Sequence, residues 1–153
     1  MTYNYSYLVG FPGAWLMHMS AHWYAAALTK QSKDMKFFDN RSPRAYLAKV
    51  TALEKQTPDQ QKYIRAEAAN ANGAEAIPLF GLAIIAGNMA RLPAETMNRF
   101  VFTWLGLRAL YNVLYIGTNG HKLSFLRSLT FVGAIFSTFN IFIKAGRVLN
   151  GGI

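Results

Sequence analysis

Arg108 places a positive charge in the middle of a long apolar run of the sequence. The run covers residues 100–116, reads FVFTWLGLRALYNVLYI and approaches the length of a bilayer span. A cation at that depth costs about 3 kcal/mol or more, so it is usually paired with another group or has a function. Another apolar run begins at Glu75, and this carboxylate is the candidate partner of Arg108.

Further polar side chains recur at helical spacing on two of the predicted helices. Residues separated by three, four or seven positions share one face of a helix. Each of the two helices therefore presents one polar face, and the two faces can meet near one end of a bundle. The residues are Arg65, Asn72 and Glu75 on the earlier helix, and Arg108, Tyr111 and Tyr115 on the later one.

Arg127 and Ser128 stand at the start of the last predicted helix, at the same end of the bundle. With the two polar faces they would form a cationic site that contains tyrosine hydroxyls and one carboxylate. Such a site suits a small anion that also carries an ammonium group. Glu75 would bind the ammonium, while Arg65 and Arg127 would bind carboxylates through charge-assisted hydrogen bonds. A thiol beside Arg127 and the Ser128 hydroxyl would have a lowered pKa, because both groups stabilise the thiolate.

The same residues also have a purely structural interpretation. Arg108 and Glu75 would then be a buried pair that holds two helices together. Tyr111 and Tyr115 would be packing residues or members of an aromatic belt at the membrane surface. The spacing alone gives the structural and the functional interpretation equal weight.

Two histidines, His18 and His22, lie four residues apart in the first apolar run, a spacing that is compatible with a metal site. No third ligand is evident in the sequence, so a packed or interfacial pair is expected and a zinc site is not. The chain has no cysteine, which excludes disulfides and thiolate metal sites. Any thiol chemistry must therefore use a thiol that a substrate brings.

Four apolar runs predict an all-α membrane protein, a four-transmembrane-helix bundle in a single domain over residues 1–153. The runs cover residues 7–28, 74–90, 98–116 and 123–143. The second run is short, but its helix can begin earlier. Thr57 is a good N-cap, Pro58 fits the first helical position and Gln60 completes a capping box. A helix over residues 58–89 would be about 48 Å long and would project from the bilayer.

A polar segment at residues 30–65 separates the first two apolar runs. A short helix is expected to begin at Ser42-Pro43 within it. One face of this helix carries an apolar stripe, which is expected to pack against the bundle in the ordinary way. The stripe consists of Tyr46, Leu47, Val50 and Leu53.

The distribution of cations predicts the orientation of the protein in the membrane. The side richer in Lys and Arg should face the cytosol, and both termini should then face the lumen or the outside. The richer side holds residues 30–65, Lys122 and Arg127; the poorer side holds Arg91, Arg99, Lys144 and Arg147. The formal net charge of +9 thus belongs to charged loops, and no nucleic acid partner is expected. The start, MTYNYSYLVG, has no basic n-region, so an uncleaved first span is expected rather than a signal peptide.

Three stretches of the sequence resemble the MAPEG family, the membrane-associated proteins in eicosanoid and glutathione metabolism. RAEAANANGAEAIPLF resembles the second-helix signature, in which an Arg precedes a Glu by ten residues, an Asn precedes it by three and a Pro follows. LRALYNVLYI matches the family's Arg followed seven residues later by Tyr, and RSLTF resembles the Arg-Ser that opens the fourth helix. The matching positions are Arg65, Asn72, Glu75, Pro78, Arg108, Tyr115, Arg127 and Ser128.

The resemblance implies a homotrimer of four-helix bundles in the endoplasmic reticulum or another internal membrane. Glutathione would be the co-substrate, bound at subunit interfaces that open to the cytosol. The implied activity is that of a divergent microsomal glutathione transferase, which conjugates glutathione to a lipophilic electrophile or reduces it. Arg127 matches the residue that stabilises the thiolate, and Arg108 matches an arginine with a more structural role. The positions that match family glutathione contacts are Asn72, Glu75, Tyr115, Arg127 and Ser128.

The chain also departs from the family pattern at several positions. Ala68 and Ala71 replace residues that are often basic in eicosanoid-producing members, and each charge-assisted hydrogen bond lost is worth about 1.5–3 kcal/mol. Asn70 replaces a His, Tyr111 another polar residue and Phe131 a hydroxyl residue. These departures leave a second function open: a MAPEG-like scaffold without glutathione chemistry that serves in assembly, in lipid binding or as a non-glutathione isomerase.

Overall fold

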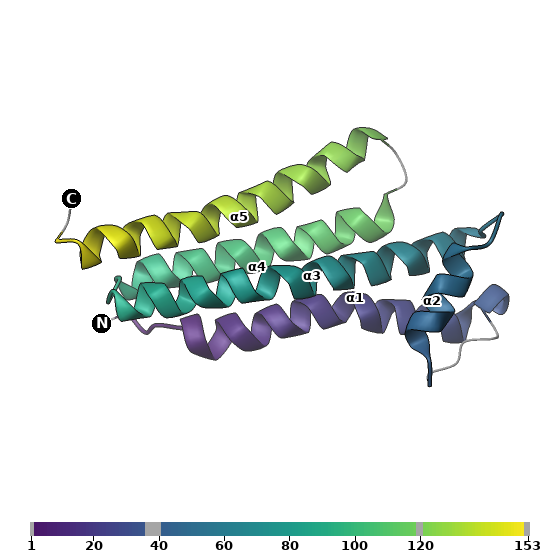
Figure 1. Cartoon of the computed structure of the whole chain (residues 1–153), viewed down its shortest axis with the longest axis horizontal. Helices are drawn as coiled ribbons and strands as arrows, with labels where there is room; N and C mark the ends of the chain where they lie inside the picture. The colour runs from purple at the N-terminus through teal and green to yellow at the C-terminus, as the bar shows by residue number, and fades with distance from the viewer. Residues whose placement is uncertain (1, 36–40, 119–120, 152–153) are drawn as a thin grey trace.

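The computed structural model describes residues 2–35, 41–118 and 121–151, apart from the side chains of residues 121–123. Within these ranges the chain is almost entirely helical and contains no β-strand (Figure 1). The predicted all-α bundle with four long helices is therefore confirmed. The long helices are α1 (Phe11–Gln31), α3 (Pro58–Met89), α4 (Ala94–Gly117) and α5 (His121–Leu149). The short elements are η1 (Ser6–Gly10), η2 (Lys33–Met35) and α2 (Pro43–Thr51).

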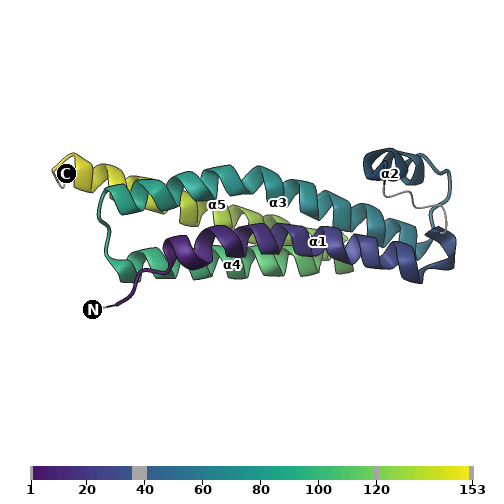
Figure 2. The same cartoon turned by 90° about the horizontal axis from the view of Figure 1, so that it is seen from below.

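The four long helices lie side by side, and the bundle has two distinct ends (Figures 1 and 2). We call one the terminus end, because it holds both chain termini and the connection from α3 to α4. We call the other the α2 end, because α2 lies there, at the same end as the last turn of α4 and the start of α5. Residues 36–40 of the predicted polar segment and the side chain of Lys122, which entered the predicted orientation, lie outside the described residues.

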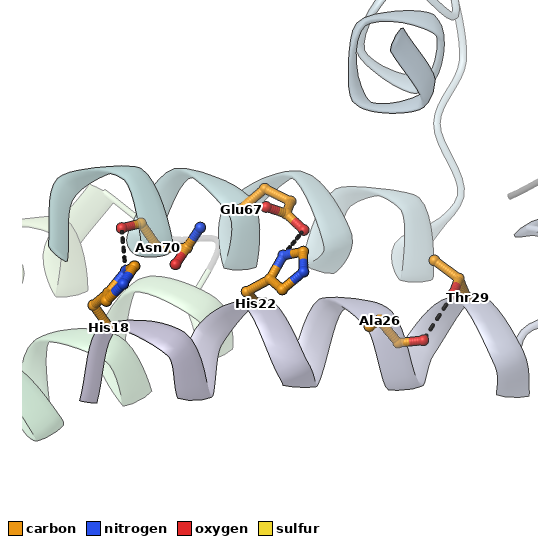
Figure 3. A network of polar contacts seen from close by, with 6 residues as sticks. All are labelled: His18, His22, Ala26, Thr29, Glu67 and Asn70. Carbon is orange, nitrogen blue, oxygen red and sulfur yellow. Dashed lines mark hydrogen bonds and ion pairs between the residues drawn. The ribbon is translucent and has the colours of Figure 1, made fainter. Parts of the chain in front are cut away.

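Three helices in the described part of the chain have the length and apolar composition of a membrane span: α3, α4 and the Ser124–Leu149 part of α5. Helix α1, with 21 residues, is long enough but more polar, since it carries His18, Ser20 and His22. Both histidines are turned toward α3, as Figure 3 shows. The predicted first span, α1, thus joins the three apolar helices in the bundle, but its composition alone does not mark it as a span.

The start of α3 follows from a local sequence signal. The Thr57 backbone N–H donates to Gln60 Oε1 at 2.9 Å, and the Gln60 backbone N–H donates to Thr57 Oγ1 at 3.4 Å. This reciprocal pair satisfies two N–H groups that the first helical turn leaves without partners. The predicted capping box and the predicted bounds of this helix are both confirmed.

Two hydrophobic clusters stabilise the bundle at different levels. The larger lies toward the terminus end, where Phe80 stacks on Trp104 with ring centroids 3.9 Å apart. The smaller joins α2 to α3, where Tyr46 and Tyr63 meet edge to face at 5.5 Å. Because α2 lies beyond the apolar part of α3, this burial removes surface from water, at about 25 cal/mol per Å².

The predicted apolar stripe of α2 packs against the bundle in part. Tyr46 and Val50 are buried, and Leu47 packs against their cluster. Leu53 is wrongly included in that stripe, since it is 42% exposed. The reason is that α2 ends at Thr51, so that Leu53 no longer follows the helical period.

Helices α1 and α3 approach each other closely at Gly73. A Cβ atom at this position would lie 2.6 Å from the His18 Cβ and 3.2 Å from the His18 Cα. Small residues allow such close packing between membrane helices. Gly73 therefore fixes the position of α1 beside the polar part of α3.

Candidate functional site

A cavity of about 410 Å³ lies between α3, α4 and α5 toward the α2 end of the bundle. Most of the residues that the sequence predicts for a binding site meet in it. Those in the lining are Asn72, Tyr111, Tyr115, Arg127 and Ser128. Ser124, Phe131 and Val132 complete the wall. The structure thus brings five of the eight predicted site residues together.

Aromatic rings of α4 form one side of the cavity and position its cation. Tyr111 and Tyr115 lie one turn apart on the same face, with ring centroids 5.4 Å apart. The Arg127 guanidinium lies 4.7 Å from the centroid of the Tyr115 ring. This cation–π contact is worth about 0.5–1 kcal/mol at an exposed site and limits the directions that the guanidinium can take.

Ser128 follows Arg127 on α5 and is exposed. Its hydroxyl donates to the Ser124 carbonyl at 3.5 Å, which is long for a hydrogen bond between oxygens. Arg127 is half-buried. The Ser128 hydroxyl can therefore turn toward a ligand at little cost, while the Tyr115 ring keeps the Arg127 guanidinium beside the cavity.

Arg108 lies behind this cavity, inside the bundle, and is 2% exposed. Its Nη1 donates to Asn72 Oδ1 at 2.9 Å, and its guanidinium lies 4.7 Å from the Tyr111 ring. Its Nη2 is buried and has no hydrogen-bond partner among the described residues. Arg108 thus holds Asn72 in place from behind.

The predicted pairing of Arg108 with Glu75 is wrong. Asn72 takes the hydrogen bond, and Glu75 is exposed on the outside of α3. Three residues advance a helix by about 4.5 Å and turn it by about 300°, so Glu75 lies about 60° around α3 from Asn72. Helical spacing places both residues on one broad face, but it does not tell which of them points at α4.

Arg65 lies beside the cavity and does not belong to its lining. Its Nε donates to the Ile116 carbonyl at 3.0 Å, in the last turn of α4. Carbonyls of a last helical turn have no partner within the helix, so this bond caps α4 and ties it to α3. The charge of Arg65 is close enough to interact with that of Arg127. Arg65 therefore contributes to the positive potential of the site.

His18 and His22, predicted as a packed or interfacial pair, contact α3, but the sequence analysis did not predict their partners. His22 Nδ1 lies 2.9 Å from Glu67 Oε1, and His18 Nδ1 lies 3.4 Å from the Asn70 carbonyl (Figure 3). The spacing of His18 and His22 indicates that they share one face of α1, but only the contact of His22 with Glu67 joins two side chains, so the sequence gives no signal for the partner of His18. The two histidines therefore bind α3 separately, each through its own partner.

The described residues contain no group of three His, Cys, Asp or Glu side chains that could hold a metal ion.

A polar contact also links α1 to α4, where Asn112 Nδ2 donates to the Met17 carbonyl at 2.9 Å. Polar side chains in the middle of this bundle thus join its helices to one another.

The family comparison extends the resemblance from three stretches to nearly the whole chain. The MAPEG family model matches residues 5–147, which include all of α1, α2, α3 and α4 and most of α5. The chain belongs to the MAPEG family. No curated protein and no solved structure matches it. Membership in the MAPEG family and the apolar helices together make it a multi-pass integral membrane protein.

Proposed function

We propose that this MAPEG protein is a membrane-bound, glutathione-dependent transferase or peroxidase that acts on lipophilic electrophiles. The observation that carries the proposal is the cavity in which Asn72 and Tyr115 face Arg127 and Ser128. These four residues come from three helices and match family glutathione contacts. Such a set offers a cation, hydroxyl donors and an amide to one small peptide.

The proposed chemistry begins with the thiol of glutathione. Arg127 would stabilise the thiolate by its charge, and the Ser128 hydroxyl would donate a hydrogen bond to the sulfur. In conjugation, the thiolate forms a carbon–sulfur bond and the electrophile loses its leaving group. In reduction of a hydroperoxide, the sulfur takes one oxygen, an alcohol leaves, and a second glutathione forms the disulfide and releases water.

The rest of the glutathione molecule would be held by residues around the cavity. Asn72 is held by Arg108, so its amide presents a defined direction to the peptide. Arg65 adds positive potential for a carboxylate. Tyr111 and Arg108 would act mainly from behind, by fixing Tyr115 and Asn72. Preorganised polar groups of this kind avoid the cost of ordering them when the ligand binds.

Glu75 supports a site that two copies of the chain share. Its carboxylate is exposed on α3, outside the cavity of its own protomer, where it can meet the ammonium of a glutathione bound between subunits. We therefore propose a homotrimer with glutathione at each interface. The α2 end, which holds most of the cations, would face the cytosol, where glutathione is supplied. The endoplasmic reticulum or another internal membrane is the proposed location.

The electrophile would arrive from the lipid. Val132 belongs to the cavity wall and is 41% exposed, and its neighbour Leu129 is 57% exposed. Apolar molecules dissolved in the bilayer can therefore reach the thiolate without crossing water. An apolar wall that is open to lipid can accept many electrophiles, so it does not specify which electrophile is the substrate.

The decisive experiment measures thiolate absorbance in the ultraviolet when glutathione is mixed with the detergent-purified protein at neutral pH. Arg127→Ala should abolish the absorbance rise and lower kcat/KM for conjugation by about 100-fold to 1,000-fold, because a preorganised charge is lost. Arg147→Ala removes the same charge from an exposed position near the other end of α5 and should change neither.

Two results would overturn this mechanism. One is full conjugation activity in Arg127→Ala. The other is the absence of both thiolate absorbance and binding heat in the wild-type protein. The second result would favour the MAPEG scaffold without glutathione chemistry, in keeping with the loss of basic residues at Ala68 and Ala71.

A further inference from the structure

A second cavity, of about 440 Å³, lies between α4 and α5 at the terminus end. It is separate from the proposed glutathione site, with which it shares no lining residue. Its floor contains the buried side chains Phe100 and Ile141. Polar residues line its two sides, although both helices are apolar enough to span a bilayer.

The polar lining consists of two matching stripes. On each helix, three polar residues follow one another at intervals of three and four, which places them on one face. Because α4 and α5 run in opposite directions, the two stripes face each other across the cavity. Lys144 is the α5 stripe residue nearest the terminus end, and on α4 Arg99 lies between Thr96 and the deeper Thr103. The stripes are Thr96, Arg99 and Thr103 on α4, and Ser137, Asn140 and Lys144 on α5.

The depth of these residues corresponds to the surface layer of a membrane. A span of about 20 residues, counted from Thr118 along α4, ends near Arg99. The same count from Ser124 along α5 ends near Lys144. The hydroxyls of Thr103 and Ser137 then lie about 6–10 Å deeper, at 1.5 Å per residue. The cations are therefore at the level of lipid head groups, and the hydroxyls of Thr103 and Ser137 lie below them.

The charges at the mouth of the cavity favour an anion. Glu95 accepts a hydrogen bond from Arg99 at 3.0 Å, but both side chains are 77% exposed, and such surface pairs contribute little. Arg99 and Lys144 against Glu95 leave one positive charge in excess. The first turn of α4 is nearby, with no side-chain hydrogen bond at its Pro93 cap, so its free N–H groups add positive potential.

Large apolar side chains flank the two stripes on the lipid side. Phe102, Phe136 and Ile143 are 53%, 68% and 56% exposed. Each stands directly beside a stripe residue in the sequence. A molecule that fills the cavity with a polar head would therefore find apolar surface for hydrocarbon chains next to it.

We propose that this cavity binds one phospholipid from the membrane leaflet at the terminus end. The lipid phosphate binds Arg99 and Lys144 through charge-assisted hydrogen bonds. The ester carbonyls below it accept hydrogen bonds from Thr103 and the Asn140 amide, and from Ser137 when its hydroxyl turns away from the Ala134 carbonyl, to which it donates at 2.7 Å. The acyl chains lie over the exposed phenylalanines. A free phosphate would use the two cations alone and would gain nothing from the deeper donors.

The test uses the full chain, delipidated in detergent and mixed with phosphatidylglycerol, with bound lipid counted by native mass spectrometry. The wild type should retain one lipid per chain. R99Q/K144Q should weaken binding at least tenfold. R91Q/R147Q is the matched control, since it removes two cations from the same end outside the cavity, and it should weaken binding less than twofold. Circular dichroism verifies that both variants keep their helices.

Two further ligands separate the sources of the phosphate. Diacylglycerol with the same chains has no phosphate and should bind at least tenfold more weakly. Inorganic phosphate at millimolar concentration should fail to displace the lipid. T103V/S137A should weaken the ester lipid about threefold and leave an ether-linked lipid, which has no ester carbonyls, unchanged.

Several outcomes would overturn the proposal. An equal loss of bound lipid in R91Q/R147Q would mean that lipid binding depends on the overall charge of the terminus end and not on this cavity. Equal retention of diacylglycerol, or displacement by inorganic phosphate, would remove the phospholipid as the ligand. A change of oligomeric mass in R99Q/K144Q, with no change in bound lipid, would assign the cavity to contact with a second copy.

Discussion

The two cavities of the bundle are similar in volume, about 410 Å³ at the α2 end and about 440 Å³ at the terminus end, yet they are built differently. The first includes Asn72 from α3, which is bonded to the buried Arg108. The second has two basic residues, Arg99 and Lys144, and both are exposed.

This difference separates two ways in which a membrane bundle can hold a polar ligand. Buried and bonded groups have fixed directions, so they can recognise one molecule and orient it for a reaction. Exposed cations adapt to their ligand and contribute charge more than direction. Substitutions of the buried, bonded groups at the first cavity should therefore affect folding and function together, whereas those in the second cavity should affect ligand binding alone.

The largest expected effect on stability is that of Asn72→Leu. This change leaves the buried Arg108 guanidinium without its partner, so the free energy of unfolding should fall by about 2–3 kcal/mol. Asn140→Leu is the matched control at the exposed cavity, where the change should stay within about 0.5 kcal/mol. Unfolding in mixed detergent measures both. Equal losses in the two variants would contradict the distinction between the cavities.

Gly73→Ala should have the second-largest effect on stability. The new methyl group would meet the His18 Cβ at 2.6 Å and the Arg108 Nη2 at 3.6 Å, so α1 must move away from α3. We expect a loss of about 1–2 kcal/mol, as is common for an overpacked core, and weaker glutathione binding because Asn72 is adjacent. Gly106→Ala on α4 meets no atom within 4 Å and should cost nothing. Lipid binding at the other cavity should survive both changes, and its loss in Gly73→Ala would show that the two cavities are coupled.

Replacement of Tyr115 should have a smaller effect, confined to the ligand. Tyr115→Leu removes the ring under the Arg127 guanidinium, and loss of a contact of about 0.5–1 kcal/mol should weaken glutathione binding about twofold to fivefold. Tyr115→Phe keeps the ring and removes the hydroxyl, so the two variants separate stacking from hydrogen bonding. Calorimetric titration compares them. A larger loss in Tyr115→Phe than in Tyr115→Leu would refute the role of stacking.

The smallest effect concerns alkaline pH and is limited to the α2 end. Burial raises the pKa of the Tyr46 phenol above its ordinary value of 10.0, because the charged form is poorly solvated there. The docking of α2 is therefore unaffected below about pH 10 and weakens as the pH rises through the higher folded-state pKa. Tyr46→Phe has no phenol to ionise and should remove this pH dependence.

The chain has no cysteine, so one spin label can report this loosening. A label at Leu53→Cys, near the end of α2, should gain mobility above about pH 10. A label at Leu149→Cys, at the terminus end, should stay unchanged. Both positions are exposed, at 42% and 67%. Equal mobilisation of the two labels would indicate global unfolding and exclude a local effect of Tyr46.

The sequence predicted the fold where local signals decide it. The bounds of α3 follow from the cap at Thr57, and Pro93 marks the break before α4. The first helix was harder to recognise as a membrane span, because its histidines make it more polar than the three apolar helices. Their polarity is satisfied by Glu67 and a backbone carbonyl of α3, and such partners are visible only when the two helices are placed side by side.

The convergence of five of the eight predicted site residues was foreseen, but the pairing of Arg108 was not. Asn72, Tyr111, Tyr115, Arg127 and Ser128 were expected to converge, and they line one cavity. The partner of Arg108 was predicted wrongly, because Asn72 and Glu75 share one broad face of α3 and the sequence does not tell which of them points at Arg108. The bond from Arg65 to the end of α4 could not be foreseen either, since its acceptor is a backbone carbonyl that every sequence has.

The sequence by itself determined which segments are helices, which of them suit a membrane, and the family to which the chain belongs. These properties depend on caps, on hydropathy and on residue spacing, all of which act over a few turns of helix. The tertiary structure decided which polar groups are buried, which are bonded to each other and which remain free for a ligand. That outcome depends on the rotation of each helix about its own axis, and a rotation of about 60° is enough to exchange Glu75 for Asn72 beside Arg108.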